Sequence, residues 1–246
     1  MPALSFADRI GDVLPLTVIE RSALGDLTER ERVLRRGATL VRQNERSVEL
    51  FALKSGMMMG YVLLDDGSRQ ILRFIFPGDL LGSDVLAYSK AQQTLVATAD
   101  SVVAPIDRQA LVDVMLRHPR LALALAALEQ AECVAMADRL AAIAKTSARA
   151  RVAAVLLEIR ERMGRVDAAI GNSFIPGLTQ EELGDAVGLT SVHVNRMLRQ
   201  LEDMRLIARS AGRFTILDEA GLRRAAGHVD RRARVDLSWL PEQQRG

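Results

Sequence analysis

The chain has 246 residues and a formal net charge of +2 at pH 7, and this length allows one large domain or two ordinary ones, each with its own core. Its single cysteine, Cys133, excludes an intramolecular disulfide framework and any four-cysteine zinc or iron–sulfur site within one chain, so a reducing compartment is expected. No apolar run approaches the roughly 20 residues of a membrane span, and the first residues lack a signal-peptide pattern, so we expect a cytoplasmic protein without membrane contact.

Glycines divide the first half of the chain into short apolar runs. The runs cover residues 49–53, 57–64 and 70–76, and the glycines that punctuate this half are Gly37, Gly56, Gly60, Gly67, Gly78 and Gly82. Such runs are typical of short antiparallel strands joined by turns. We therefore expect residues 1–118 to form a compact antiparallel β domain, followed by a helical second half.

Residues 119–145 are expected to form one long helix, because the segment after Pro119 has no glycine or further proline and is rich in alanine and leucine. Its larger apolar residues predict one stripe, made of Leu121, Leu125, Leu128, Cys133, Met136, Leu140 and Ile143. Alanines widen the apolar surface, so we expect one face to pack on the β domain and another on a second copy of the chain. A core helix of a monomer is the alternative. Cys133 is expected to be a small core residue.

A helix break is expected at Thr146 or Ser147, since either residue can cap a new helix, and the break would act as a hinge. Residues 119–146 would thus be a dimerisation helix with its hinge. The next helix is expected to bury Val152, Val155, Leu156 and Ile159. Residues 164–177 contain glycine, asparagine and proline and predict a loop.

Residues 178–201 predict a helix-turn-helix. Thr179 and Glu182 form a capping box that starts a helix at Gln180, and Gly188 can take the positive φ that a sharp turn needs. Helix pairs joined by a short glycine turn also occur as plain packing units, so the motif alone does not establish DNA binding.

The second helix of the motif can be capped by Thr190 or Ser191. Its buried stripe is expected to hold Val194, Met197, Leu198 and Leu201. Its outer face is expected to hold Ser191, Val192, Asn195, Arg196 and Arg199. Small, amide and guanidinium groups suit base edges and phosphates, so we expect this face to enter a major groove.

Residues 206–217 predict two short strands around a glycine-containing hairpin, directly after the second helix. A helix-turn-helix followed by a hairpin is a winged helix, which we place over residues 147–222. Residues 147–246 carry 16 arginines against 13 acidic residues, an excess too small to indicate nucleic acid by itself.

Residues 223–246 are expected to be a C-terminal tail. Its arginine cluster consists of Arg231, Arg232 and Arg234. The cluster either tracks a phosphate backbone or belongs to a solvated extension, and the solvated extension is the ordinary case for a chain terminus.

These features together resemble the Crp/Fnr superfamily of bacterial transcription regulators. The resemblance covers nearly the whole chain and rests on the turns at residues 66–67 and 77–82, the long helix, residues 147–152 and the helix-turn-helix with its wing. It implies an α+β fold: an N-terminal antiparallel β-roll (a double-stranded β-helix, jelly-roll-like), a long dimerisation helix and a C-terminal winged helix-turn-helix. Asn44 fits a β-roll turn, since asparagine visits the left-handed region readily.

The resemblance also implies specific DNA contacts. The predicted DNA-binding residues are Thr179, Thr190, Ser191, Val192, His193, Asn195, Arg196, Arg199 and Arg213. The arginine with which the family touches DNA matches Arg196, and we expect Arg196 and Asn195 to read bases. Phosphates are expected at Thr179, His193, Arg199 and Arg213. Ser191 and Val192 replace the family's usual arginine and glutamate, so the half-site of its better-known members is not expected.

The family's cyclic-nucleotide cassette has a Gly-Glu pair and an Arg-Ser or Arg-Thr pair, and this chain has Gly82-Ser83 and Gln93-Thr94 instead. These four residues form the candidate effector pocket. A neutral glutamine cannot replace the guanidinium at a phosphate, so cyclic AMP is not expected.

Other cofactors of the family are not expected either. Residues 1–40 contain no cysteine, which excludes the family's iron–sulfur sensor within one subunit. His118-Pro119 is expected to be a helix-start turn rather than a haem site, and no metal site is expected.

The expected function is a sequence-specific transcription regulator that acts as a homodimer on a palindromic promoter site. Its partners would be double-stranded DNA, RNA polymerase and an unidentified small-molecule effector. The alternative is a ligand-binding β-roll module that works through protein–protein contacts. No nucleophile elbow, phosphate loop or paired metal ligands appear, so an enzyme is not expected.

Overall fold

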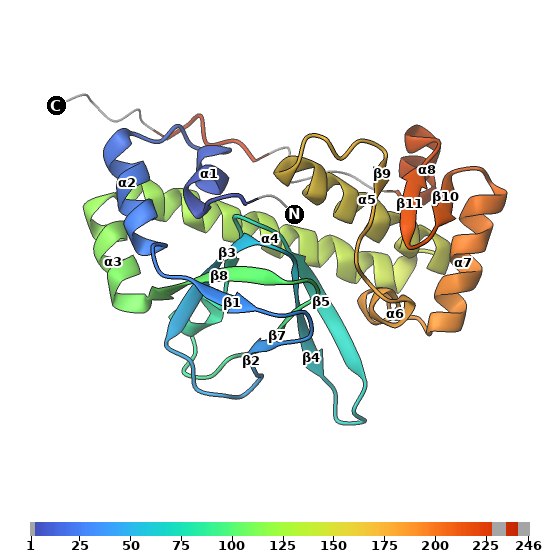
Figure 1. The fold of residues 1–246 in the computed structure, drawn as a ribbon, viewed down its shortest axis with the longest axis horizontal. Coiled ribbons are helices and arrows are strands. Elements are labelled where there is room, and N and C mark those ends of the chain that lie inside the picture. The colour runs from blue at the N-terminus through green and yellow to red at the C-terminus, as the bar shows by residue number, and fades with distance from the viewer. Residues whose placement is uncertain (1–2, 228–234, 241–246) are drawn as a thin grey trace.

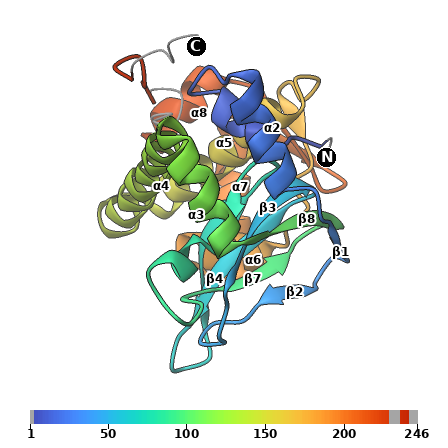
Figure 2. The same ribbon diagram turned by 90° about the vertical axis from the view of Figure 1, so that its left-hand side faces the viewer.

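The structure, a computed structural model, describes residues 3–227 and 235–240. Figure 1 shows an N-terminal half built on β-sheets beside a C-terminal half of helices and a small sheet, with one long helix running along both. Three short helices flank the sheets: α1 (Phe6–Gly11), α2 (Val18–Leu27) and α3 (Arg108–Arg117). Figure 2, turned by 90°, shows α2 and α3 on the side of the sheets that faces the viewer.

Two four-stranded antiparallel sheets form the N-terminal half. One has the order β1 (Arg32–Leu34), β8 (Ser101–Asp107), β3 (Glu49–Ser55), β6 (Leu80–Leu81). The other has the order β2 (Thr39–Val41), β7 (Thr94–Ala97), β4 (Met58–Leu63), β5 (Arg69–Ile75). The first strands pair with the last, so the chain wraps into a β-roll around a buried core. The predicted antiparallel β domain is confirmed, and its three apolar runs form β3, β4 and β5.

The turns of the β-roll follow the sequence signals. Asn44 takes the left-handed conformation with a φ of +68°, as expected from its position in a turn. Gly67 closes the β4–β5 hairpin with a φ of +82°, a value that favours glycine.

Helix α4 (Pro119–Lys145) confirms the predicted long helix. Its N-terminal half packs on the β-roll, and its buried residues are Leu121, Ala124, Leu125 and Leu128. The predicted stripe is wrong beyond that point, because Met136 and Leu140 are 45% and 69% exposed. Cys133 is also exposed and is not a core residue. An alanine-rich helix can carry two apolar stripes, and only one of them faces its own chain.

The predicted break between helices is confirmed, and Ser147 rather than Thr146 caps the next helix, α5 (Ala148–Val166). The Ser147 hydroxyl accepts a hydrogen bond from an amide of the first turn at 3.2 Å. The chain reverses here, so α5 runs back along α4, and Arg139 of α4 pairs with Glu158 of α5 at 2.6 Å. The predicted stripe of Val152, Val155, Leu156 and Ile159 is buried.

The C-terminal half confirms the predicted winged helix-turn-helix. It contains α6 (Gln180–Val187), α7 (Ser191–Asp203), β10 (Ile207–Ser210) and β11 (Arg213–Ile216). Two elements were not predicted. Strand β9 (Ser173–Phe174) lies in the expected loop and pairs with β11, and helix α8 (Glu219–Ala226) crosses the expected boundary at residue 222.

Residues 235–240 correct the expectation of a solvated tail. Leu237 and Leu240 are 6% and 7% exposed, and both belong to the apolar cluster of the N-terminal half that contains Phe6 and Ile10. The predicted cluster of Arg231, Arg232 and Arg234 lies outside the described residues.

Helix α6 packs on strand β5 where the two halves meet. Arg69 of β5 pairs with Asp185 of α6 at 2.6 Å, and the Gln70 side-chain amide donates a hydrogen bond to the backbone oxygen of Asp185 at 2.7 Å. One buried apolar cluster continues from Ile71 in β5 to Leu183 in α6. The C-terminal half is therefore docked on the N-terminal half by packing as well as by polar contacts.

Candidate nucleic-acid interface

The first helix of the motif begins at the predicted capping box. The Thr179 hydroxyl accepts a hydrogen bond from the amide of Glu182 at 3.1 Å, and the Glu182 carboxylate accepts one from the amide of Thr179 at 2.7 Å. Gly188 ends the helix with a φ of +67°. Both residues that the sequence assigns to the ends of α6 thus have the expected geometry.

Gly184 permits a close backbone approach inside the motif, a role that was not predicted from the sequence. A Cβ atom at this position would lie 2.3 Å from the backbone oxygen of Leu189. The turn between α6 and α7 folds back on α6 at this point, so glycine is required. The available signal was a glycine in the interior of a predicted helix, which commonly marks a close backbone contact.

Helix α7 is strongly amphipathic and lies at the end of the molecule farthest from α2 and α3 (Figure 1). Thr190 is its cap and accepts a hydrogen bond from the amide of His193 at 3.3 Å. The predicted inner stripe of Val194, Met197, Leu198 and Leu201 is buried. On the outer face Ser191, Val192, Arg196 and Arg199 are exposed, while Asn195 is half-buried.

Asn195 of the outer face is held in place by a contact with the wing. Its Oδ1 accepts a hydrogen bond from Nη1 of Arg209 in β10 at 3.3 Å, and Arg209 also pairs with Glu202 at 2.7 Å. The hydrogen bond from Arg209 lowers the pKa of the Glu202 carboxyl, so this pair stays ionised at neutral pH. The contact fixes the orientation of the Asn195 side chain on α7.

Two further residues that are predicted to contact phosphates, His193 and Arg213, are exposed. The His193 Nδ1 atom is 3.2 Å from the Thr190 hydroxyl, at the N-terminus of α7. Exposed Arg213 follows the wing turn, in which Ala211 and Gly212 have φ of +49° and +76°. Both side chains are therefore accessible to a ligand beside α7 and the wing.

Thr179→Ala is expected to destabilise the protein by about 1 kcal/mol, because α6 loses its cap. It should also weaken binding to all DNA sequences alike, since a phosphate contact carries no base information. Thermal unfolding and DNA titrations at a fixed salt concentration measure the two effects. Thr179→Ser keeps the hydroxyl and should restore both. Equal loss in the serine variant would show that the hydroxyl is not responsible.

Ser83 of the candidate effector pocket is engaged within the chain. Gly82 has a φ of +70° and precedes the 3-10 helix η1 (Ser83–Leu86), and the Ser83 hydroxyl donates a hydrogen bond to Glu129 of α4 at 3.2 Å. Burial raises the pKa of the Glu129 carboxyl, and the charge of nearby Arg73 opposes this effect. When this carboxylate is ionised, an anionic ligand beside Ser83 would be repelled by it.

Gln93 and Thr94 form the other part of the candidate effector pocket. Thr94 is buried, and its hydroxyl accepts a hydrogen bond from the amide of Gln43 at 3.1 Å. The Gln93 Oε1 atom is buried and has no hydrogen-bond partner among the described residues. A Cβ atom at Gly60 would lie 2.2 Å from this oxygen, so glycine makes room for the amide. Gln93 is thus the member of the pocket with an unused acceptor.

No group of three or more His, Cys, Asp or Glu side chains within residues 3–227 and 235–240 is placed to hold a metal ion. His118 forms the predicted turn at the start of α4, with Pro119 in the first helical turn. No helix in the same part of the chain is both long enough and apolar enough to cross a membrane.

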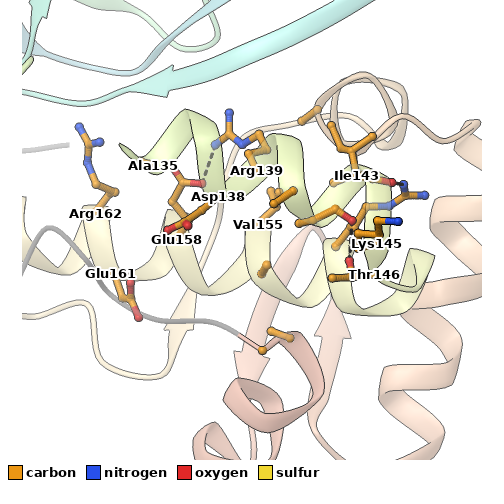
Figure 3. A pocket seen from close by; sticks show the side chains of 18 of the residues that line it. Ala135, Asp138, Arg139, Ile143, Lys145, Thr146, Val155, Glu158, Glu161 and Arg162 are labelled. Carbon is orange, nitrogen blue, oxygen red and sulfur yellow. Dashed lines mark hydrogen bonds and ion pairs between the residues drawn. The ribbon is translucent and has the colours of Figure 1, made fainter. Parts of the chain in front are cut away.

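A groove of about 380 Å³ lies between α4 and α5 (Figure 3). Ile143 and Val155 supply apolar surface, and the ion pair of Arg139 with Glu158 lies on its wall. Gly227, the residue that ends α8, also lines the groove. None of the four candidate effector residues lines it.

Comparison with known proteins divides the chain as the structure does. Residues 31–118 match the model of the cyclic nucleotide-binding domain, and residues 150–225 match the Crp-like helix-turn-helix domain. The chain is 25% identical to the fumarate and nitrate reduction regulatory protein of Escherichia coli over 218 residues, which cover 88% of this chain and 87% of that protein.

Solved structures share this fold. FixK2 from Bradyrhizobium japonicum superposes with a TM-score of 0.74 at 24% identity, covering 81% of this chain and 98% of that one. A CRP-family transcriptional regulator from Thermus thermophilus gives a TM-score of 0.62 at 25% identity, covering 80% of this chain and 97% of that one. Both similarities cover at least 80% of this chain.

Proposed function

This chain belongs to the Crp/Fnr superfamily of DNA-binding transcription regulators, and we propose that it acts as a homodimer on a palindromic DNA site. The observation that carries the proposal is the outer face of α7, where Ser191, Val192, Arg196 and Arg199 are all exposed. Arg196 and Asn195 would read base edges, and Thr179, Thr190, His193, Arg199 and Arg213 would position the motif on phosphates. Ser191 and Val192 would contact the groove without a charged group.

A second apolar stripe on α4 supports the homodimer. Exposed residues recur along the helix at alternating spacings of three and four: Leu123, Ala126, Gln130, Cys133, Ala137, Leu140 and Ala144. This is the heptad spacing of a coiled-coil seam, and its small residues permit close approach of a second helix. A two-fold axis along α4 would present two α7 helices to two half-sites, which makes the DNA site palindromic.

Leu140→Asp is expected to abolish dimerisation while leaving the fold of each chain intact. Leu140 is 69% exposed in the single chain, so the change costs little there, but it would bury a carboxylate at the seam of the dimer. Sedimentation should show a monomer, and specific DNA affinity should fall because only one half-site is bound. Leu116→Asp, on α3 and 74% exposed, is the matched control. A dimer that persists in Leu140→Asp would place the interface elsewhere.

The β-roll would not bind a cyclic nucleotide. Gln93 stands at the place of the phosphate-binding guanidinium, and the Glu129 carboxylate lies at hydrogen-bond distance from Ser83. A phosphate there would lack the guanidinium of the family's cassette and, when Glu129 is ionised, would face a carboxylate. Any effector would therefore be a different small molecule, bound near Gly82, Ser83, Gln93 and Thr94. RNA polymerase would be the partner through which the bound regulator changes transcription. The protein would work without catalysis.

The assignment of regions follows from this function. Residues 1–118 would be the sensor domain and residues 119–146 the dimerisation helix with its hinge. The DNA-binding domain would run from residue 147 and include all of α8, which crosses the boundary at residue 222 that the sequence suggests.

Selection of bound sequences from a random DNA pool tests the proposed function. The purified protein is used without small molecules at one salt concentration, because phosphate contacts make affinity depend strongly on salt. Enrichment of a palindrome would support a homodimeric regulator that needs no effector. A single half-site would contradict the dimer. Absence of enrichment, also after addition of a small-molecule extract, would contradict specific DNA binding.

A further inference from the structure

Residues 235–240 form an ordered turn beyond the winged helix. The Leu240 amide donates a hydrogen bond to the Leu237 carbonyl at 2.9 Å, and the Ser238 amide donates one to Oδ1 of Asp236 at 2.9 Å. These bonds close a compact turn in which an aspartate side chain replaces a backbone acceptor. The turn places the two leucines three residues apart and leaves Trp239 64% exposed.

The turn belongs to the N-terminal half, although it follows the C-terminal half in sequence. Leu237 and Leu240 are buried in the apolar cluster that α1 and α4 supply with Phe6, Ile10 and Leu125. Val235 packs against the same cluster. Figure 1 shows this segment beside α1, away from the wing of the DNA-binding motif. Residues 235–240 thus lie on the N-terminal half.

The length of the connection limits how far the two halves can separate. Gly227 ends α8 in the groove between α4 and α5, and Val235 already lies on the N-terminal half. Eight residue steps reach at most roughly 28 Å when fully extended. While the two leucines stay buried, α8 cannot move farther than this from the cluster of α1 and α4. This segment is then a further connection between the two halves, beside the hinge at residues 146–147, the junction of α6 with β5, and the pair of Arg162 with Asp79.

We propose that residues 235–240 are a detachable strap, whose two leucines occupy the apolar cluster of α1 and α4 and hold the C-terminal half in its docked arrangement. The two leucines bury apolar side chains that an untethered end would leave in water, and this burial is the force that seats the strap. The apolar cluster of α1 and α4 binds a short peptide with apolar residues three apart, and this peptide is the chain's own C-terminal segment. The strap lies away from the outer face of α7, so it acts on the orientation of the motif and not on its DNA contacts.

Trp239 is the only tryptophan of the chain and reports directly on the strap. Its fluorescence anisotropy is measured in the full-length protein and compared with that of a synthetic peptide of residues 235–240. The double variant Leu237→Asp with Leu240→Asp should lower the anisotropy to near the value of the peptide, while circular dichroism stays unchanged. The matched control is Leu116→Asp with Leu217→Asp, which adds the same charge at two exposed leucines and should keep the high anisotropy.

Hydrogen exchange tests the second part of the proposal. In the double strap variant, amides of the hinge and of the contact between α6 and β5 should lose protection by on the order of tenfold, whereas the core of the β-roll should not change. Leu240→Ala is a milder change and should give intermediate values of the Trp239 anisotropy and of the amide protection. A wild-type anisotropy equal to that of the free peptide, or unchanged exchange at the hinge after the strap is released, would overturn the proposal.

Discussion

Arg196→Ala is expected to remove most of the sequence-specific DNA affinity while leaving the fold intact. The residue is exposed on the outer face of α7, so its truncation opens no cavity. A bidentate contact of arginine with a base edge contributes about 1–3 kcal/mol of discrimination, and a dimer would lose it in both half-sites. Titration of the selected site and of a site mutated at the contacted base should show a large loss for the first and almost none for the second.

Arg35→Ala is the matched control for this variant. Arg35 is also exposed and carries the same charge, but it lies in the N-terminal half, where its pair with Asp100 is in solvent. It should leave DNA binding unchanged. If Arg196→Ala bound the selected site as well as the wild type does, α7 would not be the reading helix, and a module that works through protein–protein contacts would become the better account.

Signals within a few residues of each other were predictable from the sequence. The capping box of Thr179 with Glu182 and the turn at Gly188 need only local backbone geometry, and both are present in the structure. The amphipathic spacing of α7 is equally local and identified its buried and outer faces. The outer face, the main part of the candidate site, therefore followed from the sequence.

Elements that depend on distant partners could not be predicted in the same way. Strand β9 has two residues, and it exists because Phe174 and its neighbour pair with β11 about forty residues later. The hydrogen bond between Asn195 and Arg209 also joins two elements, and Asn195 is half-buried although it was predicted to lie on the outer face. Leu237 and Leu240 were predicted to belong to a tail, because the apolar cluster that buries them is formed by residues far away in the sequence, such as Phe6 and Ile10.

The exposed part of α4 could not be predicted for a different reason. Leucines and alanines cover most of the helix, so hydrophobic spacing fits several stripes equally well. The structure assigns Leu121 and Leu125 to the chain's own core and leaves Cys133 and Leu140 exposed. A sequence cannot distinguish burial in one chain from burial against a second one, because the same apolar residues serve both.

Arg162→Ala is expected to destabilise the protein by about 3–5 kcal/mol, because it breaks a buried ionic contact between the two halves. Arg162 of α5 is 5% exposed, pairs with Asp79 of the β5–β6 turn, and approaches Glu132 of α4 at 3.5 Å. Its guanidinium also lies 4.8 Å from the ring centroid of Phe76. Removal of the cation would leave two carboxylates in a poorly solvated place. Urea unfolding, with the midpoint and slope analysed together, measures the loss.

A double-mutant cycle separates the ion pair from the packing of the arginine stem. Asp79→Asn keeps an acceptor for the Phe76 amide, which Asp79 binds at 2.9 Å, but removes the charge. In the Asp79→Asn background Arg162 lacks a main partner. Arg162→Ala should therefore lower the free energy of unfolding by at least about 1 kcal/mol less in that background than in the wild type. Additive losses would mean that Arg162 stabilises the junction through its contact with the Phe76 ring and its buried stem. A smaller loss from Arg162→Ala in the Asp79→Asn background would show that the two side chains act together. The charge of Asp79, on the turn beside the effector pocket, would then hold α5 in place, and with it the helix-turn-helix.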